Sequence, residues 1–314
     1  MLEKLLWSLI QVVLCVLLAP FIQGIIKNVK AKLQNRIGPS IFQPYRDLIK
    51  YFKKDAVISE HASYFTRITP YICFTVVLVI CLMIPMFTLR APLGIAGDLF
   101  LIVYLFALSR FFTALTALDA GSSFGGMGSG REMMLAAILE PALLLSAMAV
   151  LLQIGTTKLD VAVIAISSQP ELVLQPTYFL AFIAMLIVII TETGRIPVDN
   201  PDTHLELTMI HEGMLLEYSG RYLGLMMWAA QIKQLLVFSI FISLFFPWGM
   251  AAVNGNFLSL GIGLILFILK LIGIGIVLAV IETMYAKMRL FKVPKLLASS
   301  MILSILAIII TVVM

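Results

Sequence analysis

The chain has 314 residues, of which 61% are hydrophobic and only 12% are charged, and its formal net charge is +5. A mean hydropathy of +1.06 excludes a soluble globular domain of this length and predicts an all-α membrane protein, a single polytopic domain over residues 1–314. The first apolar segment is too long for a signal-peptide core and lacks a small-residue cleavage site, so we expect it to be retained.

Eight segments are long and apolar enough to cross a bilayer. Their ranges are 5–26, 68–89, 98–118, 132–154, 177–195, 224–246, 258–284 and 295–314. Sixteen Lys and Arg residues lie on the side that carries the 27–67 loop, against three on the other side. The positive-inside rule therefore predicts that the 27–67 loop is cytoplasmic and that both termini face outward.

The cysteines give no sign of a metal or redox site on this chain. Cys15, Cys73 and Cys81 stand singly within apolar segments, and no CxxC pair occurs. Iron–sulfur ligation and structural zinc need such clustered ligands. We therefore expect no cofactor and no metal on this chain. The apolar composition leads us to expect the lipid bilayer as its partner, and no nucleic acid.

The first cytoplasmic loop contains a segment with helical periodicity, from Asn35 to Asp55. Apolar residues recur on one face of about 40–54, with Arg46, Lys50 and Lys53 opposite. This pattern predicts an amphipathic helix lying in the membrane surface. It is compatible both with anchorage on anionic lipid and with a docking surface for a peripheral partner.

A glycine-rich stretch, 121–130, precedes the fourth span. It lacks the lysine and the spacing of a phosphate-binding loop, so nucleotide binding is not supported. We expect a tight surface loop that another protein's backbone can approach closely. Arg131 and Glu132 at its end would open the fourth span.

An acidic segment, Thr191 to Gly220, separates two apolar spans. It holds six of the 17 acidic residues, namely Glu192, Asp199, Asp202, Glu206, Glu212 and Glu217. Residues 205–218 are predicted to be helical, with Asn200 as N-cap. On such a helix Glu206 and Glu217, eleven residues apart, share one face. The HExxH spacing of zinc enzymes is absent near His204 and His211, so a metal site is not favoured.

Six charged residues fall within the apolar spans: Arg110, Glu140, Glu192, Lys233, Lys270 and Glu282. Each costs roughly 2.5–3.5 kcal/mol near the bilayer centre if it faces lipid. They must therefore face a wet or paired interior. Lys233 and Lys270 are expected near the midplane and Glu192 and Glu282 near the cytoplasmic mouth. Structural salt bridges explain any one of them, while the whole set favours a proton pathway.

Several motifs occur together in one order along the chain. They are NRIGP at 35–39, QPYRDLIK at 43–50, GSGREMML at 128–135, LEP at 139–141, ETGRIPVD at 192–199 and EYSG at 217–220. With the eight spans, this order resembles the quinone-site membrane subunit of respiratory complex I, the NuoH-like family. The LDAGSSF stretch and the longer acidic segment are more similar to the counterpart subunit of group 4 [NiFe] hydrogenases and formate hydrogenlyase.

This resemblance implies a subunit of the prokaryotic inner membrane that docks the [NiFe] large subunit and the small iron–sulfur subunit. It also implies antiporter-like membrane subunits alongside. The [NiFe] centre and the iron–sulfur clusters would lie on those partners, with no catalytic residue here. The expected proton-pathway residues are Glu140, Glu192, Asp199, Glu206, Glu212, Glu217, Lys233, Lys270 and Glu282. The charges expected to support docking are Arg36, Arg46, Asp47, Arg110, Asp119, Arg131, Glu132 and Arg195.

Three other interpretations stay open. The chain could be a NuoH-type quinone-site subunit of complex I, a stand-alone ion carrier, or a structural anchor without an ion path. A carrier would need an inverted internal repeat, and no convincing repeat relates the two halves. The sequence leaves open whether protons or sodium ions are moved and which electron donor is used.

Overall fold

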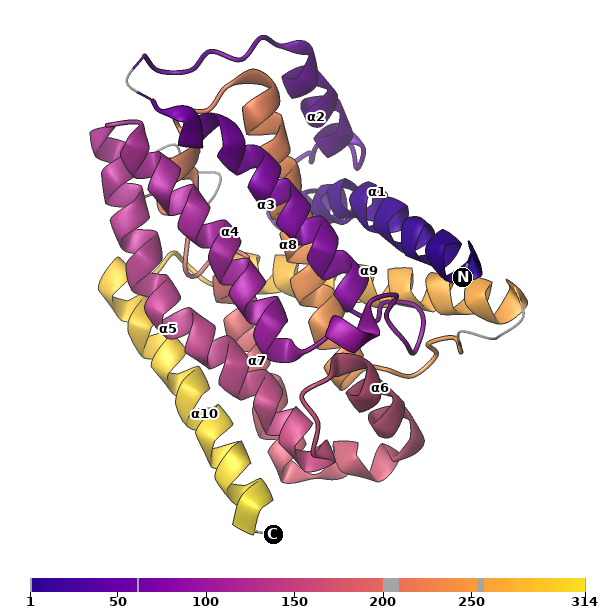
Figure 1. Ribbon diagram of the computed structural model, residues 1–314. Coiled ribbons are helices and arrows are strands. Elements are labelled where there is room, and N and C mark those ends of the chain that lie inside the picture. The colour runs from indigo at the N-terminus through magenta and orange to yellow at the C-terminus, as the bar shows by residue number, and fades with distance from the viewer. Residues whose placement is uncertain (1, 61, 200–208, 253–256, 314) are drawn as a thin grey trace.

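The computed structural model describes residues 2–60, 62–199, 209–252 and 257–313, and α-helices dominate those ranges (Figure 1). Two isolated β-bridges, Thr88–Ala251 and Asp98–Lys158, are the only β pairing there. The α-helices are α1 (Leu2–Leu33), α2 (Gln43–Lys53), α3 (Tyr64–Met83), α4 (Leu99–Asp119), α5 (Ser123–Ile154), α6 (Leu159–Ser168), α7 (Pro176–Glu192), α8 (Gly220–Phe245), α9 (Phe257–Met284) and α10 (Val293–Val313). Short 3₁₀ turns are η1 (Gly94–Ala96), η2 (Pro170–Leu174), η3 (Glu212–Leu215) and η4 (Leu290–Lys292).

The predicted membrane helices are confirmed. Within the described ranges, seven helices are long and apolar enough to cross a membrane: α1, α3, α4, α5, α8, α9 and α10. The eighth predicted span corresponds to α7, an apolar helix of 17 residues. Helix α6 and turn η2 fill residues 155–176, the connection between the fourth and fifth predicted spans.

Helix α8 forms the centre of the bundle. Its second half is buried almost completely, including Phe238, Phe241 and Phe245. Helices α1, α2, α3, α6, α7 and α9 all contact it. Helix α10 runs along α5 and α7 at one side of the molecule (Figure 1). Helices α9 and α10 bury the smallest share of their apolar length, so they present apolar faces outward.

Helix α2 confirms the predicted amphipathic helix. Pro44 and Leu48 are buried and the Phe52 ring packs edge-on against Trp228 of α8, whereas Arg46 and Lys50 are exposed. The helix lies against the start of α8, where Gly220 has a φ of +51° and a Cβ would collide with the backbone carbonyl of Asp55. Only glycine fits that position without strain. Tight packing on α8 therefore fixes α2 to the bundle.

The predicted helix over 205–218 is wrong for its described part. Residues 209–219 are irregular apart from η3. The Ile210 backbone N–H donates to Asp199 Oδ2 at 3.1 Å, so a tertiary contact satisfies a donor that a helix would have used. Glu206 and the N-cap expected at Asn200 lie outside the described residues.

The prediction of a surface loop at 121–130 is also wrong. Helix α5 begins at Ser123, so most of the glycine run forms its first turns. A Cβ on Gly128 would lie 3.2 Å from the Gly213 carbonyl carbon and the Met214 nitrogen. The close backbone approach that the glycines allow is therefore made within the chain, between α5 and η3.

Candidate functional site

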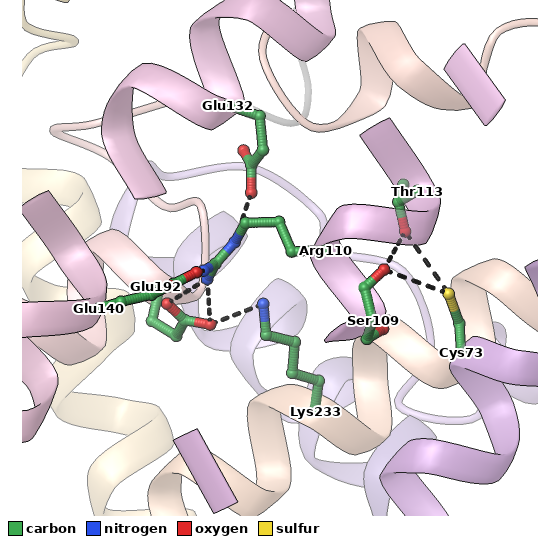
Figure 2. Close-up of polar contacts among 8 residues, drawn as sticks. All are labelled: Cys73, Ser109, Arg110, Thr113, Glu132, Glu140, Glu192 and Lys233. Atoms are coloured by element: carbon green, nitrogen blue, oxygen red, sulfur yellow. Dashed lines mark hydrogen bonds and ion pairs between the residues drawn. The ribbon is translucent and has the colours of Figure 1, made fainter. Parts of the chain in front are cut away.

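A single buried arginine on α4 gathers carboxylates from two other helices. Arg110 Nε lies 3.2 Å from Glu132 Oε1, and Nη1 lies 2.5 Å from Glu140 Oε1. Its Nη2 donates to both oxygens of Glu192 at 2.8 Å. Figure 2 shows the guanidinium at the centre of the three acids, two from α5 and one from the last turn of α7. We call Arg110, Glu132, Glu140, Glu192 and Lys233 the Arg110 cluster.

Lys233 joins this group from α8. Its Nζ lies 2.6 Å from Glu192 Oε1 and 5.9 Å from the centre of the Phe106 ring. The Glu192 side chain is only 2% exposed, whereas that of Glu140 is 32% exposed. Buried charges are tolerated when each is paired and hydrogen-bonded. The five side chains satisfy this rule while contributing three acids against two cations.

A thiol and two hydroxyl-bearing residues lie beside the cluster (Figure 2). Cys73 Sγ on α3 lies 3.5 Å from the Ser109 carbonyl oxygen and 3.5 Å from Thr113 Oγ1. Thr113 Oγ1 donates to the Ser109 carbonyl at 2.9 Å. This side of the site is therefore polar but uncharged.

A second group of charges is centred on α9. Both Lys30 Nζ and Arg195 Nη1 lie 3.2 Å from a carboxylate oxygen of Glu282, whose side chain is fully buried. Arg195 Nη2 also donates to Gln23 Oε1 and, at 3.2 Å, to Gln234 Oε1. We call Lys30, Arg195 and Glu282 the Glu282 cluster. It links α1 and α9 to the segment that follows α7.

The acidic segment is attached to the turn after α9. Lys287 Nζ lies 2.8 Å from Asp199 Oδ1, and the Met288 backbone N–H donates to the Pro197 carbonyl at 2.8 Å. Together with the Ile210 contact to Asp199, these bonds hold both sides of the segment against the α9–α10 connection.

A cavity of about 210 Å³ joins these groups. Four members of the Arg110 cluster line it, all but Glu140, and so does Arg195 of the Glu282 cluster. Polar side chains of α1 and α8 and residues of the acidic segment complete the lining. The principal polar lining residues are Gln23, Arg110, Glu132, Glu192, Arg195, Asp199, His211, Glu212, Gln231, Lys233 and Gln234.

His211 borders this cavity from the acidic segment. Desolvation lowers the pKa of His211 below its usual value, and the positive charges of Lys233 and Arg110 act in the same direction. The negative charges of Glu132 and Asp199 oppose this shift. The imidazole is therefore neutral at physiological pH.

The structure brings together many of the residues expected from the sequence. The predicted pathway residues Glu140, Glu192, Asp199, Glu212, Lys233 and Glu282 belong to the two clusters or line the cavity. Arg110, Glu132 and Arg195, expected to support docking, belong to the same two clusters. Arg131 Nη1 donates to the Met209 carbonyl at 2.9 Å and so steadies the acidic segment.

Other predicted residues lie elsewhere. Lys270 donates from Nζ to the carbonyls of Phe246, at 2.7 Å, and Trp248, at the C-terminal end of α8. It therefore lies away from the acids that would begin a pathway. Glu217 is exposed, and Glu206 lies outside the described residues.

The remaining predicted charges lie outside the two clusters. Asp119 accepts from the Ser63 backbone N–H and from Thr66 Oγ1, which joins α3 to α4. Asp47 accepts from Gln43 within α2. Arg36 and Arg46 are exposed.

Sequence reasoning missed five participating residues: Gln23, Lys30, Gln231, Gln234 and Lys287. Lys30 and Lys287 lie in predicted loops, where a lysine indicates only the orientation of the chain in the membrane. The three glutamines are polar residues in apolar spans, which is the signal that would have found them. Gln231 and Gln234 also flank Lys233 on one helix.

Comparison with known proteins gives a consistent set of relatives. The family model described as NADH dehydrogenase matches residues 6–313. Formate hydrogenlyase subunit 4 of Escherichia coli (strain K12) is 36% identical over 292 residues, covering 93% of each chain. Hydrogenase-4 component C of the same organism is 34% identical, covering 90% of this chain and 88% of its own length.

A further relative is more distant. An NADH-quinone oxidoreductase subunit of Neorickettsia sennetsu is 28% identical and covers 86% of this chain and 84% of its own length. A solved structure of the membrane-bound sulfane sulfur reductase, an archaeal respiratory membrane complex, contains a chain that matches 98% of this one and 99% of its own length with a TM-score of 0.81. At 20% identity that likeness shows the fold. The greater similarity to the hydrogenase subunits agrees with the motifs.

Proposed function

The chain belongs to the NADH dehydrogenase (NuoH-like) family, and we propose that it is the membrane subunit of a formate hydrogenlyase-like complex, in which it couples hydrogenase chemistry to ion movement. It is a multi-pass membrane protein, and its relatives are subunits of oxidoreductase complexes. The redox reaction would take place on partner subunits, and this chain would anchor them and respond to their charge.

The Arg110 cluster is the observation that carries this proposal. It contains one carboxylate more than it has cations, so it can accept a proton and still leave both cations paired. Glu140 is its most exposed acid and Glu192 its most buried one. A partly exposed acid and a buried acid, bound to the same guanidinium, suit a group that takes up a proton and holds it.

The acidic segment provides the link to chemistry outside the membrane. Asp199, His211 and Glu212 border the same cavity as Arg110 and Glu192. Electron transfer in a docked arm would change the charge near this segment and thereby shift the pKa of nearby acids. Because interacting acids titrate as a group, the cluster would respond together. A shift of one pKa unit corresponds to about 1.4 kcal/mol. A few such shifts would be enough to change the conformational equilibrium of a neighbouring ion-translocating subunit.

The partners we propose are the [NiFe] large subunit, the small iron–sulfur subunit and antiporter-like membrane subunits. The exposed face of α2, which presents Arg46, Ile49 and Lys50, offers a surface for the peripheral arm or for lipid. The apolar outer faces of α9 and α10 offer contacts for membrane neighbours.

The test is Glu140→Gln in the intact complex, reconstituted in vesicles. Hydrogen evolution and ion movement are measured together, with Glu171→Gln, an exposed acid outside the cavity, as the matched control. Loss of a positioned proton-transfer group typically slows a reaction about 10²–10⁴-fold, so we expect far fewer ions moved per hydrogen evolved. An unchanged ratio would remove Glu140 from the pathway.

Purification of the tagged chain in mild detergent separates the hydrogenase from its alternatives. Co-purification of nickel and iron–sulfur subunits would support the proposal. A flavin-bearing arm would instead favour a NuoH-type quinone-site subunit of complex I. A lone chain that moves ions by itself would favour a carrier.

A further inference from the structure

The two charge clusters approach each other at two places in the chain. On α8, Lys233 contacts Glu192 of the Arg110 cluster, and its neighbour Gln234 contacts Arg195 of the Glu282 cluster. After α7, Glu192 and Arg195 are only three residues apart. The clusters are thus neighbours in space as well as in sequence.

The ion pairs that define the two clusters stay within each cluster. The cavity of about 210 Å³ lies beside both, since it is lined by Glu192 of the Arg110 cluster and by Arg195 of the Glu282 cluster. Water occupies roughly 30 Å³ in the liquid, and a polar cavity can retain it where two to four polar partners are available. The volume therefore accommodates several water molecules.

Two atoms in the cavity wall require a partner that the described residues do not supply. Gln231 Oε1 and Gln234 Nε2 are buried and lack a hydrogen-bond partner within the described part of the chain. Buried polar groups are nearly always hydrogen-bonded, to protein or to ordered water. Both residues line the cavity, and at i and i+3 on α8 they lie on the same face.

The chemistry of these two atoms is complementary. The Gln234 amide N–H can donate to a water oxygen, and the Gln231 amide oxygen can accept from a water O–H. Gln234 Oε1 already accepts from Arg195, which orients its amide nitrogen away from that contact. One water held between the two glutamines would thus satisfy both unpaired atoms.

We propose that Gln231 and Gln234 are positioning residues that hold a chain of ordered water between Glu192 and the Glu282 cluster. The proposal rests on the ion-coupling function above and specifies its route. Glu192 in its protonated form gives its proton to the first water as one O–H bond breaks and another forms. Each water releases one proton as it receives one, and the Glu282 carboxylate, whose oxygens are buried without a hydrogen-bond partner in the described part of the chain, takes up the proton that the last water releases.

The test replaces both glutamines by leucine in the intact complex, which keeps side-chain size and removes the hydrogen bonds. We expect ions moved per hydrogen evolved to fall at least about tenfold, on the scale of a lost proton-transfer contact. The matched variant with asparagine at both positions retains an amide and should keep a measurable part of that ratio. Hydrogen evolution in detergent, where no gradient forms, reports whether the complex is intact.

The outcomes separate this inference from the function on which it rests. If Glu140→Gln abolishes ion movement and the leucine pair leaves it unchanged, the water chain is wrong and the coupling function stands. If Glu140→Gln also leaves the ratio unchanged, Glu140 and the water chain are both removed from the pathway, and the coupling function fails with them. Should the leucine pair not assemble, a high-resolution map of the wild-type complex decides. Water density bridging Gln231 and Gln234 supports the proposal, and a dry cavity overturns it.

Discussion

Replacement of Arg110 by leucine removes the common partner of three acids. The guanidinium makes contacts of 2.5–3.2 Å with Glu132, Glu140 and Glu192, and its side chain is 4% exposed. Without it, Lys233 alone pairs with Glu192. Breaking a buried ion pair by removing one partner costs about 3–5 kcal/mol, a large part of a typical stability of about 5–15 kcal/mol.

Thermal unfolding of the purified complex in detergent measures this effect. A loss of about 3 kcal/mol corresponds to a decrease in Tm of roughly 6–12 °C, at about 2–4 °C per kcal/mol. Arg36→Leu, at an exposed position, is the control and should change Tm little. Arg110→Lys keeps the charge and loses the planar fork of donors, so its Tm should fall between the two. A wild-type Tm for Arg110→Leu would refute the buried-pair reasoning.

Three further predictions concern the surroundings of the site. Because the pKa of His211 is lowered on folding, the unfolded state binds more protons as pH falls below about 6.5. Stability should therefore decrease as the pH is lowered from about 7.5 to about 5.5. His211→Gln should make Tm depend less on pH over this range. An equal dependence in both proteins would contradict the lowered pKa of His211. Gly220→Val places a side chain against the Asp55 carbonyl, so protease cleavage at α2 should accelerate severalfold; an unchanged rate would show that α2 does not need this glycine. Lys270→Met loses hydrogen bonds to carbonyls, so it should lower the free energy of unfolding by about 1 kcal/mol and Tm modestly. It should leave ions moved per hydrogen unchanged; a lower ratio would restore Lys270 to the pathway.

Much of the fold could be predicted because the membrane restricts the choice. Backbone groups in lipid must be satisfied within the chain, so long apolar segments become helices. Helix α2 could be predicted for a related reason. Because one of its faces packs on the bundle and the other does not, apolar and basic residues alternate with helical period. Helix α6 was missed because its ten residues, seven of them apolar, are too few to stand out as a helix between two long spans.

The acidic segment could not be predicted, because tertiary contacts determine its conformation. Residues 205–218 have helical periodicity, yet Asp199 binds the Ile210 backbone and Gly128 packs against Gly213. Similarly, the charges of Arg110 and Glu192 could be recognised as buried from their spans. Their pairing could not, because 82 residues separate them in sequence and only the packing of α4 on its neighbours brings them together.

The contacts of Asp199 and Pro197 with the turn after α9 have a mechanical consequence. Lys287 and Met288 tie that turn to the acidic segment through one ion pair and one backbone hydrogen bond. Helix α10 starts at Val293, only a few residues further on. A displacement of the acidic segment would therefore be transmitted through these two contacts to the start of α10. Helix α10 would then tilt relative to a neighbouring membrane protein.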